Sequence, residues 1–191
     1  FGADLTVENC QFRNNENGIL AGGPPSSVVR IRNSVFEGNG SCVGPCAHGV
    51  YAGAPIAVLD IENSVFRDTH IAHHIKSRAR ATVIAGSRIE DGAEGTSSYL
   101  IETPNGGNLL VLDNVLQKGR LSDNPEVAIS IGVEGVTNPT GTLIVQGNRF
   151  TSELPAAVVF VRNGSETEAI LRGNTLVGDV VPLTGPGKVV P

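Results

Sequence analysis

Apolar and polar residues alternate along most of the chain in short runs, and each run leads into Asn, Asp or Gly. Alternation with a period of two is typical of β-strands, because successive side chains point to opposite faces of a sheet. Asn, Asp and Gly tolerate the left-handed backbone conformation that a tight corner requires. The pattern therefore predicts short strands separated by sharp corners. The runs cover residues 5–12, 29–36, 59–66, 82–89, 109–116, 143–150 and 169–176.

These runs are copies of one degenerate repeat. Their last residues are separated by 24, 30, 23, 27, 34 and 26 positions, and repeats of this length predict stacked supersecondary units. A second short strand aligns in successive units, and its third position is apolar each time, which predicts an inward-facing column. The members of that column are Ile19, Val50, Ile75, Leu100, Ile129 and Val158.

One corner of the repeat carries Asn9, Asn33 and Asn63 at equivalent positions. Stacked side-chain amides can donate and accept hydrogen bonds from one coil to the next. We therefore expect a short polar ladder at this corner.

Stacked strands with like residues over like residues predict an all-β fold, a right-handed parallel β-helix of about seven coils over residues 1–179. Segment 180–191 is rich in Val, Pro and Gly and breaks the pattern, so we expect a C-terminal tail or cap. A β-sandwich is the rival, but it requires strands of alternating direction, and no run of two-residue hairpins supports it. The repeat resembles the pectate-lyase-like superfamily over nearly the whole chain, which implies the fold and no particular activity.

Charge and hydropathy exclude two classes of partner. The net charge is −5 with no basic run, which argues against nucleic acid. No apolar run approaches the roughly 18 residues that span a bilayer. The chain begins at Phe1 without a signal peptide, so this residue is expected to be a processed or truncated start.

The cysteines bear on the cellular compartment. Cys42 and Cys46 lie in one predicted loop, where a disulfide and two free thiols are both open. A zinc site with His48 would need a second ligand pair, which does not follow. A disulfide implies an oxidising compartment, so we expect a secreted, periplasmic or cell-surface protein. Cys10 is expected to be a small buried residue.

Residues 73–78 gather two imidazoles, an amine and a guanidinium on one short predicted strand. If Ile75 points inward, alternation directs His74, Lys76 and Arg78 outward. Neighbouring coils, about 4.8 Å away, then place tyrosines and glycines beside these charges. The result is a cationic shelf with aromatic edges, formed with Tyr51 and Tyr99.

Such a shelf suits an acidic polysaccharide. Arg78 can clamp a uronate carboxylate through two parallel hydrogen bonds, which acidifies the adjacent C5–H. Lys76, or His74 as second choice, is then the candidate base if cationic neighbours lower its pKa. Tyr51 or Tyr99 is the candidate proton donor for β-elimination or C5-epimerisation. Further candidate substrate-binding residues are His48, His73 and Asn105.

The Ile-Lys-Ser run at 75–77 resembles the strand that carries the lysine base in chondroitinase-B-like and alginate lyases, which are β-helices. The resemblance implies a catalytic role for Lys76 alone, because the match is a tripeptide and the partner arginine of those enzymes lies on a later coil. It also implies Ca²⁺ as a cofactor; otherwise no cofactor and no metal site is predicted. The candidate calcium ligands are Asp68, Asp91, Glu94 and Glu102. Residues 74–79 and 98–107 also look like uncharacterised bacterial β-helix-repeat proteins.

Other interpretations remain open. Lys76 and Arg78 can serve solubility alone, and His48, His70 and His73 would bind a metal only if the corners converge. Glu102 is expected to point inward beside Ser77, where a structural role and a catalytic acid are both open.

A different class of function is a structural or adhesive protein whose open strand edges stack into a homo-oligomer or an end-to-end filament. Non-catalytic sugar binding is a third hypothesis, weakened by the absence of Trp.

Overall fold

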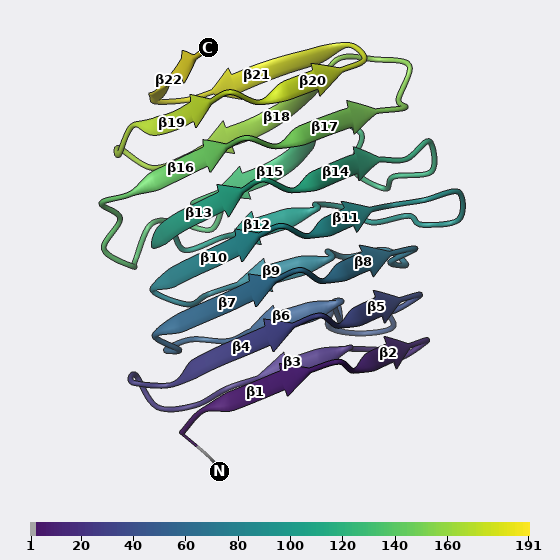
Figure 1. Cartoon of the computed structure of the whole chain (residues 1–191), viewed down its shortest axis with the longest axis vertical. Helices are drawn as coiled ribbons and strands as arrows, with labels where there is room; N and C mark the ends of the chain where they lie inside the picture. The colour runs from purple at the N-terminus through teal and green to yellow at the C-terminus, as the bar shows by residue number, and fades with distance from the viewer. Residues whose placement is uncertain (1–2) are drawn as a thin grey trace.

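The computed structural model describes residues 3–191 and confirms the predicted architecture. The chain winds through three parallel sheets, of eight, seven and seven strands, and each turn adds one strand to each sheet (Figure 1). No helix occurs in the described range. Phe1, the expected processed start, lies outside it.

Sheet 1 runs along one long face of the molecule, and its strands pair in parallel from first to last. Its strands are β1 (Leu5–Glu8), β4 (Val28–Arg32), β7 (Val58–Glu62), β10 (Ala81–Ala85), β13 (Asn108–Leu112), β16 (Leu143–Gln146), β19 (Ala169–Arg172) and β22 (Gly187–Val190).

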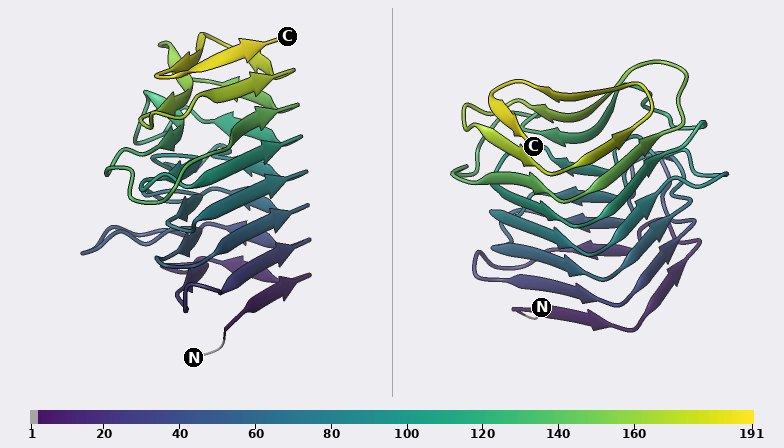
Figure 2. Two further views of the ribbon diagram at one scale, coloured as in Figure 1. Left: turned by 90° about the vertical axis from the view of Figure 1, so that its left-hand side faces the viewer. Right: turned by 45° about the horizontal axis from the view of Figure 1, so that its top comes forward.

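Sheet 2 follows sheet 1 after a sharp bend in each coil, as the view from above shows (Figure 2). Its strands are β2 (Gln11–Arg13), β5 (Val35–Glu37), β8 (Val65–Arg67), β11 (Arg88–Glu90), β14 (Val115–Lys118), β17 (Arg149–Ser152) and β20 (Thr175–Val177).

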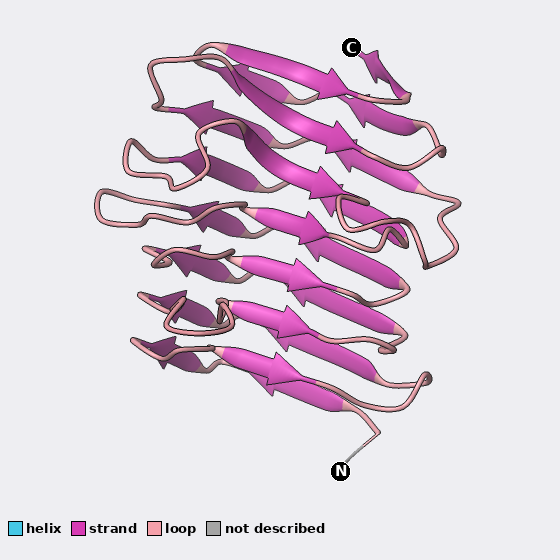
Figure 3. Cartoon of the chain, turned by 180° about the vertical axis from the view of Figure 1, so that it is seen from behind, coloured by secondary structure: helices cyan, strands magenta, loops and turns pink. Residues whose placement is uncertain are grey.

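Sheet 3 closes each coil on the opposite side and faces the viewer in Figure 3. Its strands are β3 (Ile19–Ala21), β6 (Val50–Ala52), β9 (Ile75–Ser77), β12 (Ile101–Thr103), β15 (Val127–Ile131), β18 (Val158–Asn163) and β21 (Val180–Thr184).

The bend between sheets 1 and 2 has the backbone that the repeat predicts. Asn9, Asn33 and Asn63 have φ of 55°, 49° and 49°, in the left-handed region. The polar ladder, however, is formed by the next residue of each coil. There the amide of Ser34 donates to Ser64 Oγ and the amide of Ser64 donates to Ser87 Oγ, both at 3.1 Å. The ladder continues through asparagines at 114, 148 and 174.

The core is a layered column of aliphatic and phenylalanine side chains inside the coils. Phe36 stacks on Phe12 and on Phe66, with ring centroids 4.8 and 4.6 Å apart. Equivalent residues of neighbouring coils thus cover one another, which buries the apolar face that a single coil would leave exposed.

All six residues of the predicted inward column are buried, but the register of sheet 3 differs from the prediction at two of them. Ile101, not Leu100, pairs with Ile75, and Val161, not Val158, pairs with Ile129. The alignment shifts because the segment before β12 contains one more residue, and the segment before the partner of Ile129 on β18 three more, than the sequence comparison assumed. Every residue from 98 to 103 is therefore displaced by one position relative to the prediction.

Segment 180–191, expected to be a tail or cap, contributes strands to two of the sheets. β21 pairs with β18 and β22 pairs with β19, both in parallel. Much of this segment therefore continues the coil and covers the edge of the preceding strands.

Candidate functional site

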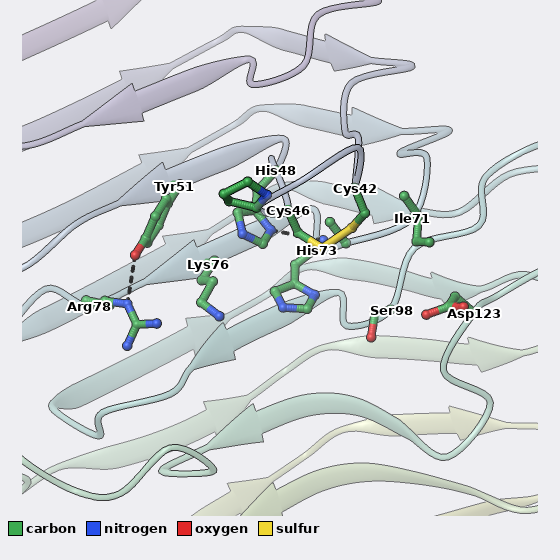
Figure 4. Close-up of a pocket in the computed structure, with 12 residues that line it drawn as sticks. Cys42, Cys46, His48, Tyr51, Ile71, His73, Lys76, Arg78, Ser98 and Asp123 are labelled. Atoms are coloured by element: carbon green, nitrogen blue, oxygen red, sulfur yellow. Dashed lines mark hydrogen bonds between the residues drawn. A yellow bond between two sulfur atoms is a disulfide. The ribbon is translucent and has the colours of Figure 1, made fainter.

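An open groove of about 530 Å³ lies on the outer face of sheet 3, in the coils of β6 and β9 (Figure 4). Its floor carries the charged and aromatic residues of the predicted shelf, and the loop around residues 42–46 forms one side. The lining includes Tyr51, Lys76 and Arg78 as predicted, together with His48 and His73.

Lys76 lies at the centre of the groove. Its neighbour on β6 is Tyr51 and its neighbour on β12 is Glu102. The Nζ atom is 2.9 Å from Glu102 Oε2 and 2.9 Å from Glu134 Oε1. Burial alone would lower the pKa of Lys76, but the two carboxylates outweigh burial and raise this pKa above its ordinary value. The expectation of a base with lowered pKa is contradicted, because Lys76 is held as an ammonium ion.

Arg78 is fixed in the groove by three partners. Its Nε donates to Tyr51 Oη at 2.8 Å, and one terminal nitrogen lies 2.7 Å from Glu134 Oε2. The other terminal nitrogen donates to Asn105 Oδ1. The guanidinium also lies over the Tyr51 ring, with Cζ 5.9 Å from the centroid. Asn105, a candidate substrate-binding residue, therefore positions Arg78.

Glu102 lies beneath the groove and anchors the side chains of His73 and Lys76. It faces outward in register with Lys76, which corrects the expectation of an inward side chain beside Ser77. Only 3% of the residue is exposed, because His73 and Lys76 cover it. Its Oε2 is 3.1 Å from His73 Nε2. Burial would raise the pKa of Glu102, but His73 and Lys76 together hold this pKa below its usual range.

A second ladder of side-chain hydrogen-bond acceptors lies in the corners that immediately precede the strands of sheet 3. Asn17 Oδ1 accepts the amide of His48 at 2.9 Å, and His48 Nδ1 accepts the amide of His73 at 3.3 Å. His73 Nδ1 in turn accepts the amide of Tyr99 at 3.3 Å. Each acceptor nitrogen must lack a proton, so these contacts assign the neutral tautomer with hydrogen on Nε2 to both rings.

The ladder stacks aromatic rings along the edge of the groove. The His48 and His73 centroids are 4.7 Å apart, and the His73 and Tyr99 centroids are 5.0 Å apart. Burial is the largest cause that lowers the pKa of His48, and the Lys76 ammonium adds to it, so that this pKa falls to about 3. His48 is therefore a neutral wall of the groove near pH 7.

His74 is not on the shelf, and this corrects its assignment as second candidate base. It is fully buried, with Nδ1 2.8 Å from Thr69 Oγ1 and Nε2 3.0 Å from Asp91 Oδ1. Strict alternation fails here because residue 74 lies at the corner before β9. At the equivalent Gly18, an added Cβ would lie 2.8 Å from a ring carbon of Phe36 in the core, so side chains at this position point inward.

Asp91 organises a buried polar network that the sequence analysis missed. Besides His74, its carboxylate accepts hydrogen bonds from Ser97, from Ser122 at 2.5 Å and from the amide of Gly119 at 2.8 Å. Burial raises the pKa of Asp91, but its partners, His74 first, outweigh this effect and lower it. These bonds tie coil to coil behind the groove.

Lys118 is a second buried charge near this network. Its Nζ donates to the carbonyl of Ser98 at 2.6 Å, and burial lowers its pKa to about 8. The alternation of β14 carried the signal, because Leu116 points inward and Lys118 follows two positions later.

Glu134, also missed, comes from the Glu134 loop, residues 132–142, which follows β15. The loop reaches back over two coils, and Glu134 meets Lys76 across 58 positions of sequence. The amides of Glu134 and Thr137 fix the loop by donating to the carbonyls of Pro104 and Asn105, both at 3.0 Å. No local pattern signals so distant a contact.

The Cys42–Cys46 disulfide is present and lines one side of the groove (Figure 4). The cysteine pair is therefore oxidised and not a zinc site. Cys10, expected to be buried, is exposed at the bend between sheets 1 and 2, where its Sγ lies 3.3 Å from the carbonyl of Glu8.

The predicted acidic residues are dispersed by the fold. Asp91 lies 3.0 Å from His74 Nε2, whereas Glu102 forms an ion pair with Lys76. Within residues 3–191, no group of three or more His, Cys, Asp or Glu side chains is placed to hold a metal ion. The same range contains no helix long and apolar enough to cross a membrane.

Comparison with known protein families identifies the family of the chain. The family model of the right-handed β-helix region matches residues 1–178. The chain therefore belongs to the right-handed β-helix family. Neither the search of curated proteins nor the search of solved structures found a match.

Proposed function

We propose that the groove over β6 and β9 binds an acidic polysaccharide. The observation that carries this proposal is the capture of one carboxylate, that of Glu134, by Lys76 and Arg78 together. Two cations that hold the two oxygens of a carboxylate form a ready site for a uronate. Tyr51 and the stacked imidazoles add ring surfaces on which a sugar can lie.

The net charge of −5 does not oppose this binding. At physiological ionic strength, charges separated by more than about 8 Å are largely screened. The cations that contact the ligand therefore dominate over remote carboxylates. With a disulfide beside the groove, we propose that the protein works as a secreted, periplasmic or cell-surface protein.

A catalytic form of this function is lyase or C5-epimerase chemistry. It is favoured by Tyr51, whose Oη accepts from Arg78 and so keeps its own proton for an oxygen in the groove. In elimination, a base would take the C5 proton, the C4–O bond would break as the C4–C5 double bond forms, and Tyr51 would protonate the leaving oxygen. In the free protein Glu102 and Glu134 hold Lys76 as an ammonium ion, so Lys76 could act as this base only after it has given up a proton.

The test is a glycan array that contains oligogalacturonate, oligoalginate, glucuronate-containing chains and neutral glycans of the same lengths. The proposal expects binding to at least one acidic chain, and loss of that binding in the Lys76→Met variant. Binding that is equal for acidic and neutral glycans would contradict it. Loss of the C5–H resonance in D₂O, followed by NMR, then separates catalysis from binding alone. Elimination removes this hydrogen, and epimerisation replaces it with deuterium.

A further inference from the structure

The Glu134 carboxylate fills the centre of the cationic site. Oε1 lies 2.9 Å from Lys76 Nζ, and Oε2 lies 2.7 Å from the Arg78 guanidinium. Each oxygen has its own cation, as the two oxygens of a bound uronate would. The Glu134 side chain remains 42% exposed, so it enters from the solvent side of the groove and not from beneath it.

Both cations keep partners when this carboxylate is removed. Lys76 retains Glu102 at 2.9 Å, and Arg78 retains Tyr51 at 2.8 Å. Glu102 is fixed on a strand and buried, whereas Glu134 belongs to a loop. Departure of Glu134 therefore leaves an ordered cationic pair that faces the groove.

The tip of the Glu134 loop, residues 133–136, makes one backbone–backbone hydrogen bond outside the loop, from the amide of Glu134 to the carbonyl of Pro104. Gly132, directly before the tip, and Gly135, within it, have φ of 73° and 94°, a left-handed backbone that glycine adopts without strain. Val133 and Val136 are 49% and 44% exposed, and neither belongs to the hydrophobic core. The base is held differently, by the Asn138 side-chain amide, which donates to the carbonyl of Arg78 at 3.2 Å.

Resting on the proposed function, we propose that Glu134 occupies the carboxylate subsite of the groove, and that an acidic ligand binds there by displacing Glu134 and the tip of its loop. A tethered carboxylate competes at an effective concentration on the order of millimolar. A single sugar acid therefore binds weakly, whereas a chain with several uronates displaces Glu134 through combined contacts.

The experiment compares wild type with Glu134→Gln, which removes the charge and keeps the side-chain size. The control is Glu168→Gln, which makes the same change in net charge at the Lys188 pair, 2.8 Å apart, on the last coil of sheet 1. The probes are D-glucuronate and an oligogalacturonate, titrated by calorimetry, with neutral galactose as a blank.

If Glu134 fills the subsite in about nine-tenths of the molecules, its removal raises apparent affinity about tenfold. We expect this gain for Glu134→Gln and none for Glu168→Gln. If wild type bound the probe and Glu134→Gln bound it with equal or lower affinity, the displacement would be contradicted and the proposed function would stand. If oligogalacturonate bound neither wild type nor Glu134→Gln, both the displacement of Glu134 and the proposed function would be contradicted.

Hydrogen exchange separates displacement from simple charge removal. The amides of Glu134 and Thr137 donate to Pro104 and Asn105 in the free protein. If oligogalacturonate displaces the tip, exchange at Glu134 accelerates in the wild-type complex, while exchange within β15 stays unchanged. Slower exchange at Glu134 would show that the loop closes over the ligand and would overturn the inference.

Discussion

Glu102 lies in register with Lys76 on the adjacent coil, and their side chains form an ion pair of 2.9 Å on the outer face of sheet 3. Although this face is the outside of the β-helix, Glu102 is only 3% exposed. The groove is therefore a cationic surface supported by a buried anion. This arrangement positions Lys76 and, through His73 Nε2, the stacked imidazoles.

Replacement of Glu102 by alanine should destabilise the protein by about 3 kcal/mol. Lys76 loses its buried counter-ion and keeps only the more exposed Glu134, and His73 Nε2 loses its partner. The free energy of unfolding, measured by urea denaturation, tests this. Glu102→Gln should cost less, since an amide oxygen can still lie beside His73 Nε2 and Lys76 Nζ.

The matched control is Glu153→Gln, in an exposed pair with Arg120 at 3.7 Å. It should change the unfolding free energy by less than about 1 kcal/mol. If Glu102→Ala were as mild as this control, Glu102 would not be the support of the groove.

Acidification below pH 6.5 should destabilise the fold through His48. Its folded pKa of about 3 lies below the ordinary 6.5, so the unfolded chain binds the proton more readily. The stability that neutral His48 provides is fully present above pH 6.5 and is lost as the pH falls towards 3. The slope is at most about 1.4 kcal/mol per pH unit. Urea unfolding at intervals between pH 7.5 and 5 measures it.

His48→Asn is the informative variant for this slope. Asn17 holds the equivalent position one coil away and accepts the amide of His48 through its side-chain oxygen. An asparagine at position 48 can accept the amide of His73 in the same way but does not titrate. The variant should therefore fold and show a shallower pH dependence between 6.5 and 5. An unchanged slope would assign the titration to another group.

The architecture was predictable because its causes are local and repeated. The left-handed corners at Asn33 and Asn63 are encoded by residue type, and alternation directs residues such as Ile31 and Ile61 into the core. The register of sheet 3 was harder to predict from the sequence. One additional residue in the corner before Ile101 shifts the alignment, and hydrophobicity does not reveal it, because both Leu100 and Ile101 are buried.

The candidate site was predictable only in part. The strand neighbours Tyr51 and Lys76 follow from the repeat, and the structure brings them together. His74 could not be placed, because a corner residue does not obey strand alternation. Glu134 could not be found, because its contact depends on how a long loop folds back over two coils.

Alkaline pH should stabilise the protein through Lys118. Its folded pKa of about 8 lies below the ordinary 10.5, so between these values the unfolded chain binds more protons than the folded chain. Stability should therefore rise from pH 8 towards 10.5 and reach its full value above 10.5. Lys118→Met should abolish this rise, which the difference in unfolding free energy between variant and wild type isolates. Equal profiles for the two proteins would show that Lys118 is solvated.

Arg78→Lys should weaken the binding of acidic glycans about tenfold or more without loss of stability. Lysine keeps the charge but cannot contact Tyr51, Asn105 and a carboxylate through one planar group, as the Arg78 guanidinium does. Calorimetric titration with an acidic oligosaccharide measures the effect, and Arg88→Lys, on sheet 2, is the control, because its pair with Glu90 lies on another face. If both arginine variants bound equally well, the groove would attract acidic chains only through general charge, and the specific geometry around Arg78 would have no part in recognition.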